Sequence, residues 1–387
     1  GTRSGEARLS GPIASADLVV TLSGSGLGAE ALAGLPPGSV RIAARLPGLA
    51  RLDADLSAEL GSAGRITGRL SLPDGFAPAD ALGLRLTGQG DLGRLAAPLL
   101  AGGADRVSGR LDLDMTAAGR IGRPTLSGRA RLSGGQWSNP ALGARLTDIA
   151  ADIRGGGEAI LIERVTAATT GGGRLSARGR IGLSEGLPID LSLQARGARP
   201  VQSDLVSGTF DADLRMTGAA LGQSRVSGSI LLRRLEIEIP ELLPRNLRVI
   251  PDIEERGRGP AVARASPVIP PPEIGLAVTL DAPRAVFLRG QGVDAELGGR
   301  IEIGGTMAAP QPVGGFSMRR GTLTLLDRRL AFSRGELGFD GTLTPTLDRA
   351  ATSRLRDLSL SATVTGPATE PRIGFSAVPE LPQDEIL

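Results

Sequence analysis

The sequence predicts an all-β protein in which many short, mostly antiparallel strands form an elongated array with very little helix. Apolar residues recur at every second position, 57 glycines and 27 prolines interrupt the apolar stretches, and a hairpin-like unit recurs along the 387 residues. Period-two alternation is typical of strands with one dry and one wet face. Abundant Gly and Pro supply the turns between such strands.

The alternation is clear from the first third of the chain onward. Leu111, Leu113 and Met115 alternate with Asp112 and Asp114. The same pattern recurs at residues 189–193, 235–239, 274–280, 301–303 and 358–364. Each segment has one aliphatic and one polar face, which indicates antiparallel sheets wetted on one side only.

A loose repeat connects these segments. Each copy is a strand, a turn of small residues that often contains Pro, a Gly and a second strand; the copies lie at 111–132, 214–232, 301–323 and, more faintly, 360–377. Repeated hairpins of this kind predict an array that grows by stacking. With about 4.8 Å per added strand, some ~25 strands would extend over roughly 100 Å.

Two segments are predicted to be helical and one to interrupt the sheet. Residues 91–100 form the best helix candidate, which Pro98 would kink or end, and a second helix could begin at 382–385. Residues 240–273 are charged and rich in Pro, which disfavours strand ladders and predicts a loop or excursion. The predicted portions are an N-terminal β-repeat portion (1–106), a central one (107–239), the loop (240–273) and a C-terminal β portion (274–387) that is truncated at its end.

The composition argues against an enzyme. The sequence contains neither Cys nor His, so disulfides, the common zinc, haem and iron–sulfur sites and the Ser-His-Asp triad are excluded. We therefore expect no catalytic residues, no cofactor and no metal site.

One glycine motif has the spacing of a dinucleotide site. Gly88, Gly90 and Gly93 match G-x-G-x-x-G after a predicted strand at 84–86 and before the helix candidate. No alternation of helices and strands follows, so there is no parallel sheet to hold a cofactor. An ordinary turn is the favoured interpretation.

Two pairs of carboxylates are candidates for a glycoside-hydrolase site. Asp211 and Asp213, like Glu236 and Glu238, are two residues apart on alternating segments and so lie on the polar face. Hydrolysis of sugars needs carboxylates that flank a bound substrate, and aromatic residues, which commonly form sugar platforms, make up only 2% of the chain. A solvated face is favoured over a reaction centre.

The charge pattern does not indicate a nucleic-acid partner. All 44 basic residues are arginines, and 41 acidic residues are interleaved with them to give a net charge of +3. The doublets Arg319/Arg320 and Arg328/Arg329 could form a phosphate-binding patch, but a solvated turn is favoured and no aromatic stacking set accompanies them.

The aliphatic face is the remaining candidate for function. It is either the core of a closed sandwich or barrel, or the lining of an open groove for acyl chains, and alternation alone does not distinguish the two. If it is a groove, the predicted lining is Leu111, Leu113, Ile189, Leu191, Leu193, Leu235, Ile237, Leu276, Val278, Leu280, Ile301, Ile303, Leu323, Leu325, Phe339, Leu358, Leu360 and Val364.

An ordered set of short motifs resembles the TamB C-terminal domain family, which is AsmA-like. The resemblance extends from about Val107 to Leu387 and is sharpest from Ile237 onward. The motifs are Ile239-Pro240 followed by Leu243-Pro244, VFLRGQGVDAELGG at 286–299, Gly304-Gly305-Thr306 with Ala309-Pro310, Gly314-Gly315-Phe316, Arg320-Gly321, Phe332-Ser333-Arg334-Gly335 and LPQDEIL at 381–387.

The resemblance implies a β-taco, that is, an open β-helix-like trough with an apolar interior, which favours the groove. It also implies a protein of the Gram-negative periplasm, anchored in the inner membrane by a segment not present here and acting with a TamA-like barrel-assembly protein of the outer membrane. No run of 18 apolar residues and no signal peptide occurs in this sequence, so we expect a fragment whose membrane contact lies outside it.

Two functions are consistent with this resemblance. The first is transport of phospholipid between the inner and outer membranes, with acyl chains on the aliphatic face. The alternative is a periplasmic chaperone or scaffold that lends its trough or a sheet edge to outer-membrane proteins, such as autotransporters, during assembly and secretion. The sequence does not rank the two.

Overall fold

The computed structural model describes a single sheet. The described residues are 2–11, 17–25, 39–59, 61–96, 100, 103–200, 203, 206–239, 273–325, 328–355, 358–370 and 372–378. The strands of the N-terminal half are β1 (Thr2–Ser10), β2 (Asp17–Ser25), β3 (Ser39–Leu46), β4 (Leu52–Glu59), β5 (Gly64–Leu72), β6 (Ala81–Asp91), β7 (Arg106–Arg120), β8 (Arg123–Asn139), β9 (Ala144–Gly155), β10 (Ala159–Thr169) and β11 (Arg174–Gly182).

The C-terminal half continues the same sheet. Its strands are β12 (Pro188–Ala198), β13 (Val206–Ala219), β14 (Gln223–Glu238), β15 (Glu273–Gly290), β16 (Val293–Gly305), β17 (Pro310–Leu325), β18 (Arg328–Asp340), β19 (Thr346–Leu355), β20 (Leu358–Pro367) and β21 (Arg372–Val378). The described helical segments are the helix α1 (Leu92–Ala96) and the 3-10 turns η3 (Pro47–Leu49), η4 (Gly61–Ala63), η5 (Pro140–Leu142) and η6 (Thr170–Gly172).

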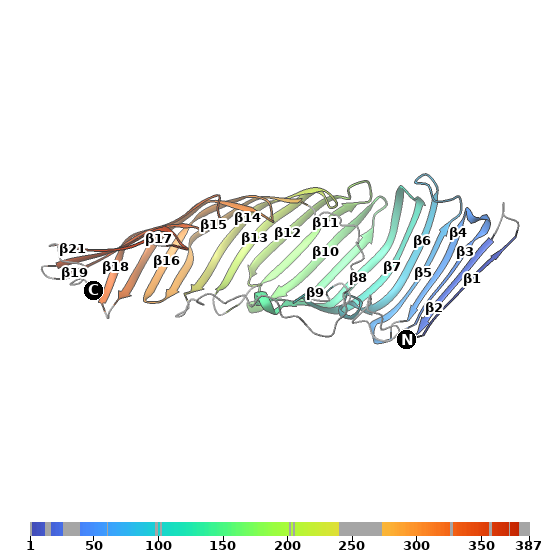
Figure 1. Cartoon of the computed structure of the whole chain (residues 1–387), viewed down its shortest axis with the longest axis horizontal. Helices are drawn as coiled ribbons and strands as arrows, with labels where there is room; N and C mark the ends of the chain where they lie inside the picture. Colours follow the sequence, from blue (N-terminus) through green and yellow to red (C-terminus); the bar gives the residue numbers. More distant parts are fainter. Residues whose placement is uncertain are drawn as a thin grey trace, which may run out of the picture.

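Strand order in the sheet follows chain order. Each described strand pairs with the next one along the chain, so the strands lie in sequence from one end of the elongated molecule to the other (Figure 1). Every pairing is antiparallel except β14 with β15, which are parallel. Parallel neighbours require a long crossover connection, and the connection here, 240–272, lies outside the described residues.

Strand registers carry one apolar face across the whole sheet. Leu113 on β7 lies opposite Gly88 on β6 and Ala130 on β8. Farther along, Leu191 on β12 lies opposite Gly179 on β11 and Met216 on β13. Because paired residues point to the same side of a sheet, these registers define a continuous apolar face and, opposite it, a polar outer face.

Cross-strand ion pairs occupy the outer face. Arg69 pairs with Asp55 at 2.8 Å, Arg131 with Asp152 at 3.0 Å, and Arg300 with Asp281 at 3.3 Å. These side chains are exposed to water, where an ion pair contributes at most about 1 kcal/mol. Their main effect is to keep the outer face hydrated and charged.

A line of β-bulges runs along the molecule from β12 to β19. Register shifts occur at positions that lie side by side across the sheet. They fall between Ala195 and Ala198 in the β12–β13 pairing, Thr209 and Phe210 in β13–β14, Leu231 and Leu235 in β14–β15, Ala282 and Val286 in β15–β16, Glu296 and Leu297 in β16–β17, and Phe332 and Arg334 in β18–β19. A bulge bends its strand and increases the local twist. Aligned bulges therefore bend the whole sheet along one line, which we call the bulge line.

Glycines on the apolar face allow neighbouring strands to approach closely. Gly179 and Gly228 lie inside strands with φ of +155° and +135°. A Cβ atom on either would lie 2.1 Å from the carbonyl oxygen of Asp190 or Asp213 on the neighbouring strand. Only glycine fits such a position, because L side chains rarely adopt this backbone conformation.

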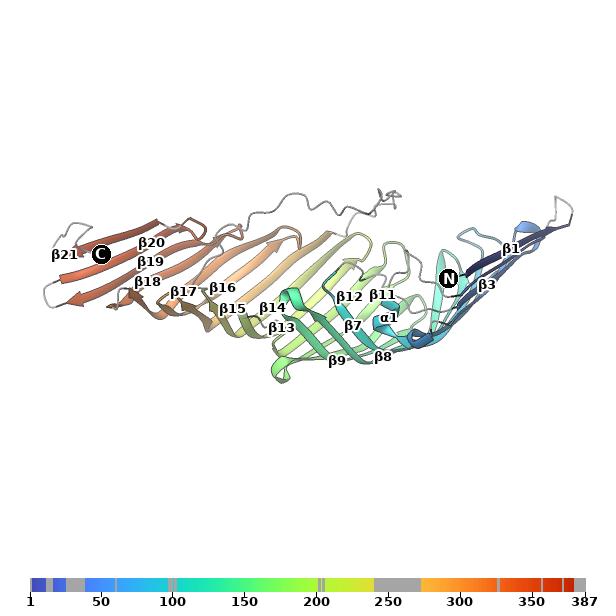
Figure 2. The same ribbon diagram turned by 60° about the horizontal axis from the view of Figure 1, so that its bottom comes forward.

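The best-packed part of the sheet lies at the bulge line. A buried cluster there contains Leu232, Ala282, Ala285, Val286, Ala295 and Leu297. The buried residues of the described chain are mostly alanines, and none with a large side chain is completely buried. A closed sandwich would bury large side chains between two layers, so the sheet forms an elongated trough whose apolar face has no second layer among the described strands (Figure 2).

The structure agrees with the predicted class of fold and differs from the sequence prediction at the glycine motif. The all-β elongated architecture is confirmed, with 21 strands in the described residues where about 25 were expected. Helix α1 lies inside the predicted 91–100, while Pro98 lies outside the described residues. The prediction of a turn at the glycine motif is wrong, since Gly88 and Gly90 lie within β6, where the absence of side chains admits close neighbours.

Other predictions fall where the structure gives no description. The loop at 240–273 is outside the described residues except for Glu273, which begins β15, and the predicted helix at 382–385 is outside them entirely. The division into portions ending at 106, 239 and 273 remains a prediction; the sheet is continuous between β6 and β7 at the first of these positions.

Candidate functional site

Backbone register places the predicted lining residues whose side chains the structure describes on the apolar face. Ile189, Leu191 and Leu193 of β12 pair with apolar-face positions of β11 and β13. The same alignment continues through Leu276, Val278 and Leu280 of β15 to Ile303 and Ile301 of β16. Leu111 and Leu113 lie on this face in β7, Leu235 and Ile237 in β14, Leu323 in β17, Phe339 in β18 and Val364 in β20.

Their exposure differs along the face. Ile189, Val278 and Ile301 are buried among their neighbours, whereas Leu193 is 39% exposed. Most of the others are half-buried, and the side chains of Leu325, Leu358 and Leu360 are outside the description. A half-exposed aliphatic surface of this extent is unusual on a monomeric soluble protein and marks a site of interaction.

The face extends farther toward the N-terminus than the predicted lining. Leu56 on β4 lies opposite Ile42 on β3, and Leu70 on β5 lies opposite Leu84 on β6. These residues were absent from the predicted set, although LDADLSA at 52–58 carries the same period-two signal.

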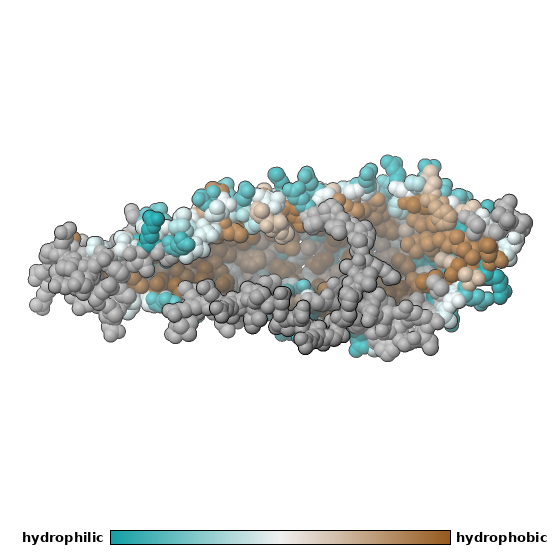
Figure 3. All heavy atoms as spheres, in the orientation of Figure 1, coloured by the Kyte–Doolittle hydropathy of each residue, from teal (hydrophilic) through white to brown (hydrophobic). Residues whose placement is uncertain are grey.

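The apolar face lines a hollow. In Figure 3 the hydrophobic side chains gather along a depression that follows the long axis, with hydrophilic side chains along its rim. Within the described part of the chain, the strands pack closely with their neighbours in the sheet, and α1 packs against β7. Away from the bulges, the described interior strands have their backbone groups paired in the ladder, so the hollow presents mainly hydrocarbon.

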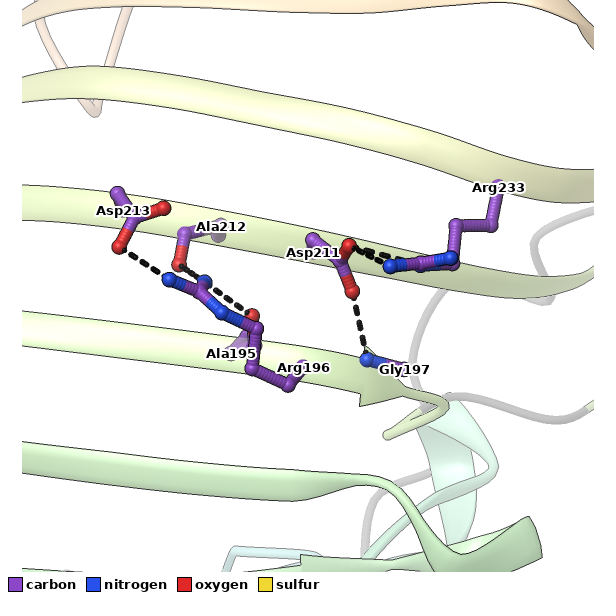
Figure 4. A network of polar contacts seen from close by, with 7 residues as sticks. All are labelled: Ala195, Arg196, Gly197, Asp211, Ala212, Asp213 and Arg233. Carbon is purple, nitrogen blue, oxygen red and sulfur yellow. Dashed lines mark hydrogen bonds and ion pairs between the residues drawn. The ribbon is translucent and has the colours of Figure 1, made fainter.

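A polar network on the outer face holds two bulges of the bulge line (Figure 4). The bulge in β12 leaves Arg196 and Gly197 without ladder partners on β13. Gly197 N–H donates to Asp211 Oδ1 at 2.7 Å, and Arg233 Nε, from the bulge in β14, donates to Asp211 Oδ2 at 2.7 Å. Arg196 Nη1 donates to the carbonyl oxygens of Ala195 and Ala212, at 2.8 and 3.0 Å.

The sequence predicts that Asp211 and Asp213 are both solvated, and the network shows that this is wrong for Asp211. Asp211 is 14% exposed and bridges β12 and β14, while Asp213 forms an exposed ion pair with Arg196. The guanidinium of Arg233, followed by the Gly197 N–H, lowers the pKa of Asp211. The carboxylate is therefore a structural link between bulges, and within the described residues no substrate cleft adjoins it.

Stability should fall in acid because of Asp211. A lowered folded-state pKa means that the ionised carboxylate stabilises the fold at and above its ordinary pKa, near pH ~4, and that this contribution is lost as pH falls through the lowered value. We expect the Tm difference between the native chain and the Asp211→Asn variant to be largest at neutral pH and to shrink below about pH 4. Thermal unfolding followed by circular dichroism across pH measures this, and in an Arg233→Gln background the pH dependence of the difference should weaken. A difference that stays constant down to pH ~2 would contradict the assignment.

The other charged motifs form ordinary outer-face contacts. Arg320 pairs with Glu296, and Arg319 and Arg329 are exposed. Phe287 lies on the outer face beneath Arg234 and Arg289, whose guanidinium carbons are 5.0 and 5.7 Å from its ring centre. This aromatic contact was not predicted, because the approach of Arg234 to Phe287 depends on the pairing of β14 with β15.

The described residues offer no other site of familiar chemistry. They contain no group of acidic side chains arranged to hold a metal ion. Among them, no helix has the length and apolar character needed to cross a membrane.

A long open sheet with an aliphatic hollow and a charged exterior defines a hydrophobic-groove protein. The sequence profile of the TamB C-terminal domain matches residues 163–387, more than half of the chain. The chain belongs to the TamB family, which is associated with the cell envelope, with translocation and assembly, and with TamA, and which is not a family of enzymes. No curated protein matches the chain.

Proposed function

We propose that the protein carries phospholipid between the inner and outer membranes along its apolar face, acting in the periplasm with a TamA-like barrel in the outer membrane. The observation that carries this proposal is the continuity of the apolar register from β2 to β20. Transfer of hydrocarbon from water to such a surface is favourable by about 25 cal/mol per Å². An acyl chain can move along the face because each strand presents the same chemistry as the last.

Backbone pairing favours acyl chains over an extended polypeptide as the occupant of the face. Away from the bulges, the described interior strands have their backbone N–H and C=O groups paired in the ladder, so a polypeptide lying on the face would leave its own backbone groups without partners. A chaperone role for outer-membrane strands would instead use a sheet edge, where unpaired groups are available. This role remains the alternative.

Photo-crosslinking from two leucines tests the proposal. Leu193 lies on the apolar face and is 39% exposed, whereas Leu231 lies on the outer face and is 41% exposed. With a photoreactive amino acid at each position in turn, we expect phospholipid adducts from position 193 and few from position 231. Equal capture at both positions, or capture of outer-membrane protein segments alone at 193, would overturn the lipid assignment.

A charge on the face should interrupt transport. Leu276 lies on the apolar face of β15, and the adjacent Ala277 is exposed on the outer face. We expect Leu276→Asp to reduce lipid transfer between donor and acceptor vesicles by about tenfold or more, because a carboxylate in the path must be desolvated by each passing chain. Ala277→Asp is the matched control and should transfer lipid at the native rate. Native transfer by Leu276→Asp would place the lipid path elsewhere.

A further inference from the structure

Arg349 is a charged residue on the apolar face. It lies in β19, opposite Gly335 of β18 and Val364 of β20, and alternates with Leu347 and Ala351 on the same strand. Among the ladder-paired positions of this face whose side chains the structure describes, it is the one charged residue. Its exposed fraction is 9%, far below that of the outer-face arginines.

The guanidinium of Arg349 lacks a partner within the described residues. Its Nε atom is buried and has no hydrogen-bond acceptor. The nearby acids Asp348 and Glu336 occupy opposite positions in the β18–β19 ladder. Both lie on the outer face, on the other side of the sheet from Arg349. Burial lowers the pKa of Arg349, as expected for a cation removed from water without an anion beside it.

An unpaired buried cation is costly unless an anion is supplied from outside the chain. Arginine remains charged at neutral pH and binds phosphate through paired N–H donors. Gly335 directly opposite has no side chain, and Met318 fills the space over that glycine, with its Cε 2.6 Å from where a Cβ would be. The unbranched, flexible Met318 side chain can change rotamer to admit a headgroup beside Arg349. The surrounding face is hydrocarbon, so the anion that reaches this arginine should itself be attached to hydrocarbon.

We propose that Arg349 binds the phosphate of a phospholipid whose acyl chains lie on the apolar face. Strands β18–β20 would then form a headgroup-binding site within the groove. This inference rests on the proposed lipid-carrying function and adds a chemical selection to it. The face would then favour phosphate-bearing lipids over neutral lipids with identical tails.

The test compares two lipids that differ only in the phosphate headgroup. The full 387-residue chain is incubated with vesicles containing equal amounts of dioleoylphosphatidylglycerol and dioleoylglycerol, and bound lipids are quantified by mass spectrometry. We expect the native chain to retain phosphatidylglycerol about tenfold over dioleoylglycerol, the selectivity of one charge-assisted contact. Arg349→Met should lose this preference while still binding both lipids, and Arg349→Lys should keep part of it.

Arg329→Met provides the matched control. Arg329 is exposed on the outer face of the neighbouring strand β18, so its loss removes the same charge without touching the groove. This variant should retain the native preference. An equal preference in Arg349→Met and the native chain would overturn the inference, and the proposed function would stand because both proteins still bind lipid.

Three further outcomes also decide the matter. If the native chain retains neither lipid, the proposed function and the headgroup inference both fail. If inorganic phosphate alone binds as tightly as phosphatidylglycerol in an Arg349-dependent manner, the site belongs to the free ion and the lipid assignment is overturned. A polypeptide that co-purifies with the native chain and is lost from Arg349→Met would likewise replace the phospholipid as ligand.

Discussion

Gly228→Ala should destabilise the centre of the sheet by about 2–4 kcal/mol. Gly228 lies in β14 with φ of +135°, and a Cβ there would lie 2.1 Å from the carbonyl oxygen of Asp213 and 3.0 Å from the Cα of Leu214. Neither contact can be relieved by rotating a flexible side chain, because both atoms belong to the backbone of β13. The strands must separate or the bend must flatten.

Hydrogen exchange in β13 and β14 is the appropriate measurement, because strands that contact only their neighbours can open locally. Gly304→Ala is the control, since the nearest atom to a Cβ at Gly304 in β16 is 3.8 Å away. We expect lost protection in the first variant and native protection in the second. Unchanged protection in Gly228→Ala would show that the strands do not approach as closely as described.

Leu232→Ala should lower the free energy of unfolding by about 2–4 kcal/mol, the usual loss for a buried leucine. Leu232 is 9% exposed and belongs to the buried cluster at the bulge line. Its neighbour Leu231 is 41% exposed on the outer face, and Leu231→Ala should cost less than about 1 kcal/mol.

Urea unfolding of the two variants measures the difference directly. The residues are adjacent in sequence and identical in type, so only the face of the sheet distinguishes them. Equal destabilisation of both, or greater destabilisation by Leu231→Ala, would mean that the apolar and outer faces are assigned the wrong way round in β14.

The sequence contained enough information to predict the class of fold and most of one face. Alternation such as Leu111-Asp112-Leu113 depends only on local geometry, and it predicted both the strands and the side each residue occupies. The direction of a neighbouring strand leaves this alternation unchanged. For that reason the parallel pairing of β14 with β15 was not predicted, although the mostly antiparallel sheet was.

The bulge line was equally hidden, because it depends on register between strands. Doublets such as Leu231-Leu232 and Arg233-Arg234 break the period of two, and in retrospect they mark the bulge in β14. Arg349 could have been singled out in the same way, since it is in phase with Leu347 and Ala351. It was missed because an arginine among apolar residues was interpreted with the other solvated arginines.

Chain-order pairing has a consequence for how such proteins vary in size. Each hairpin added to or removed from the array changes the end-to-end distance by about 10 Å, two strand spacings, while the bend that shapes each segment is set by residues within that segment and the next. Insertion or loss of whole hairpins can therefore change the length of the trough while leaving its cross-section unchanged.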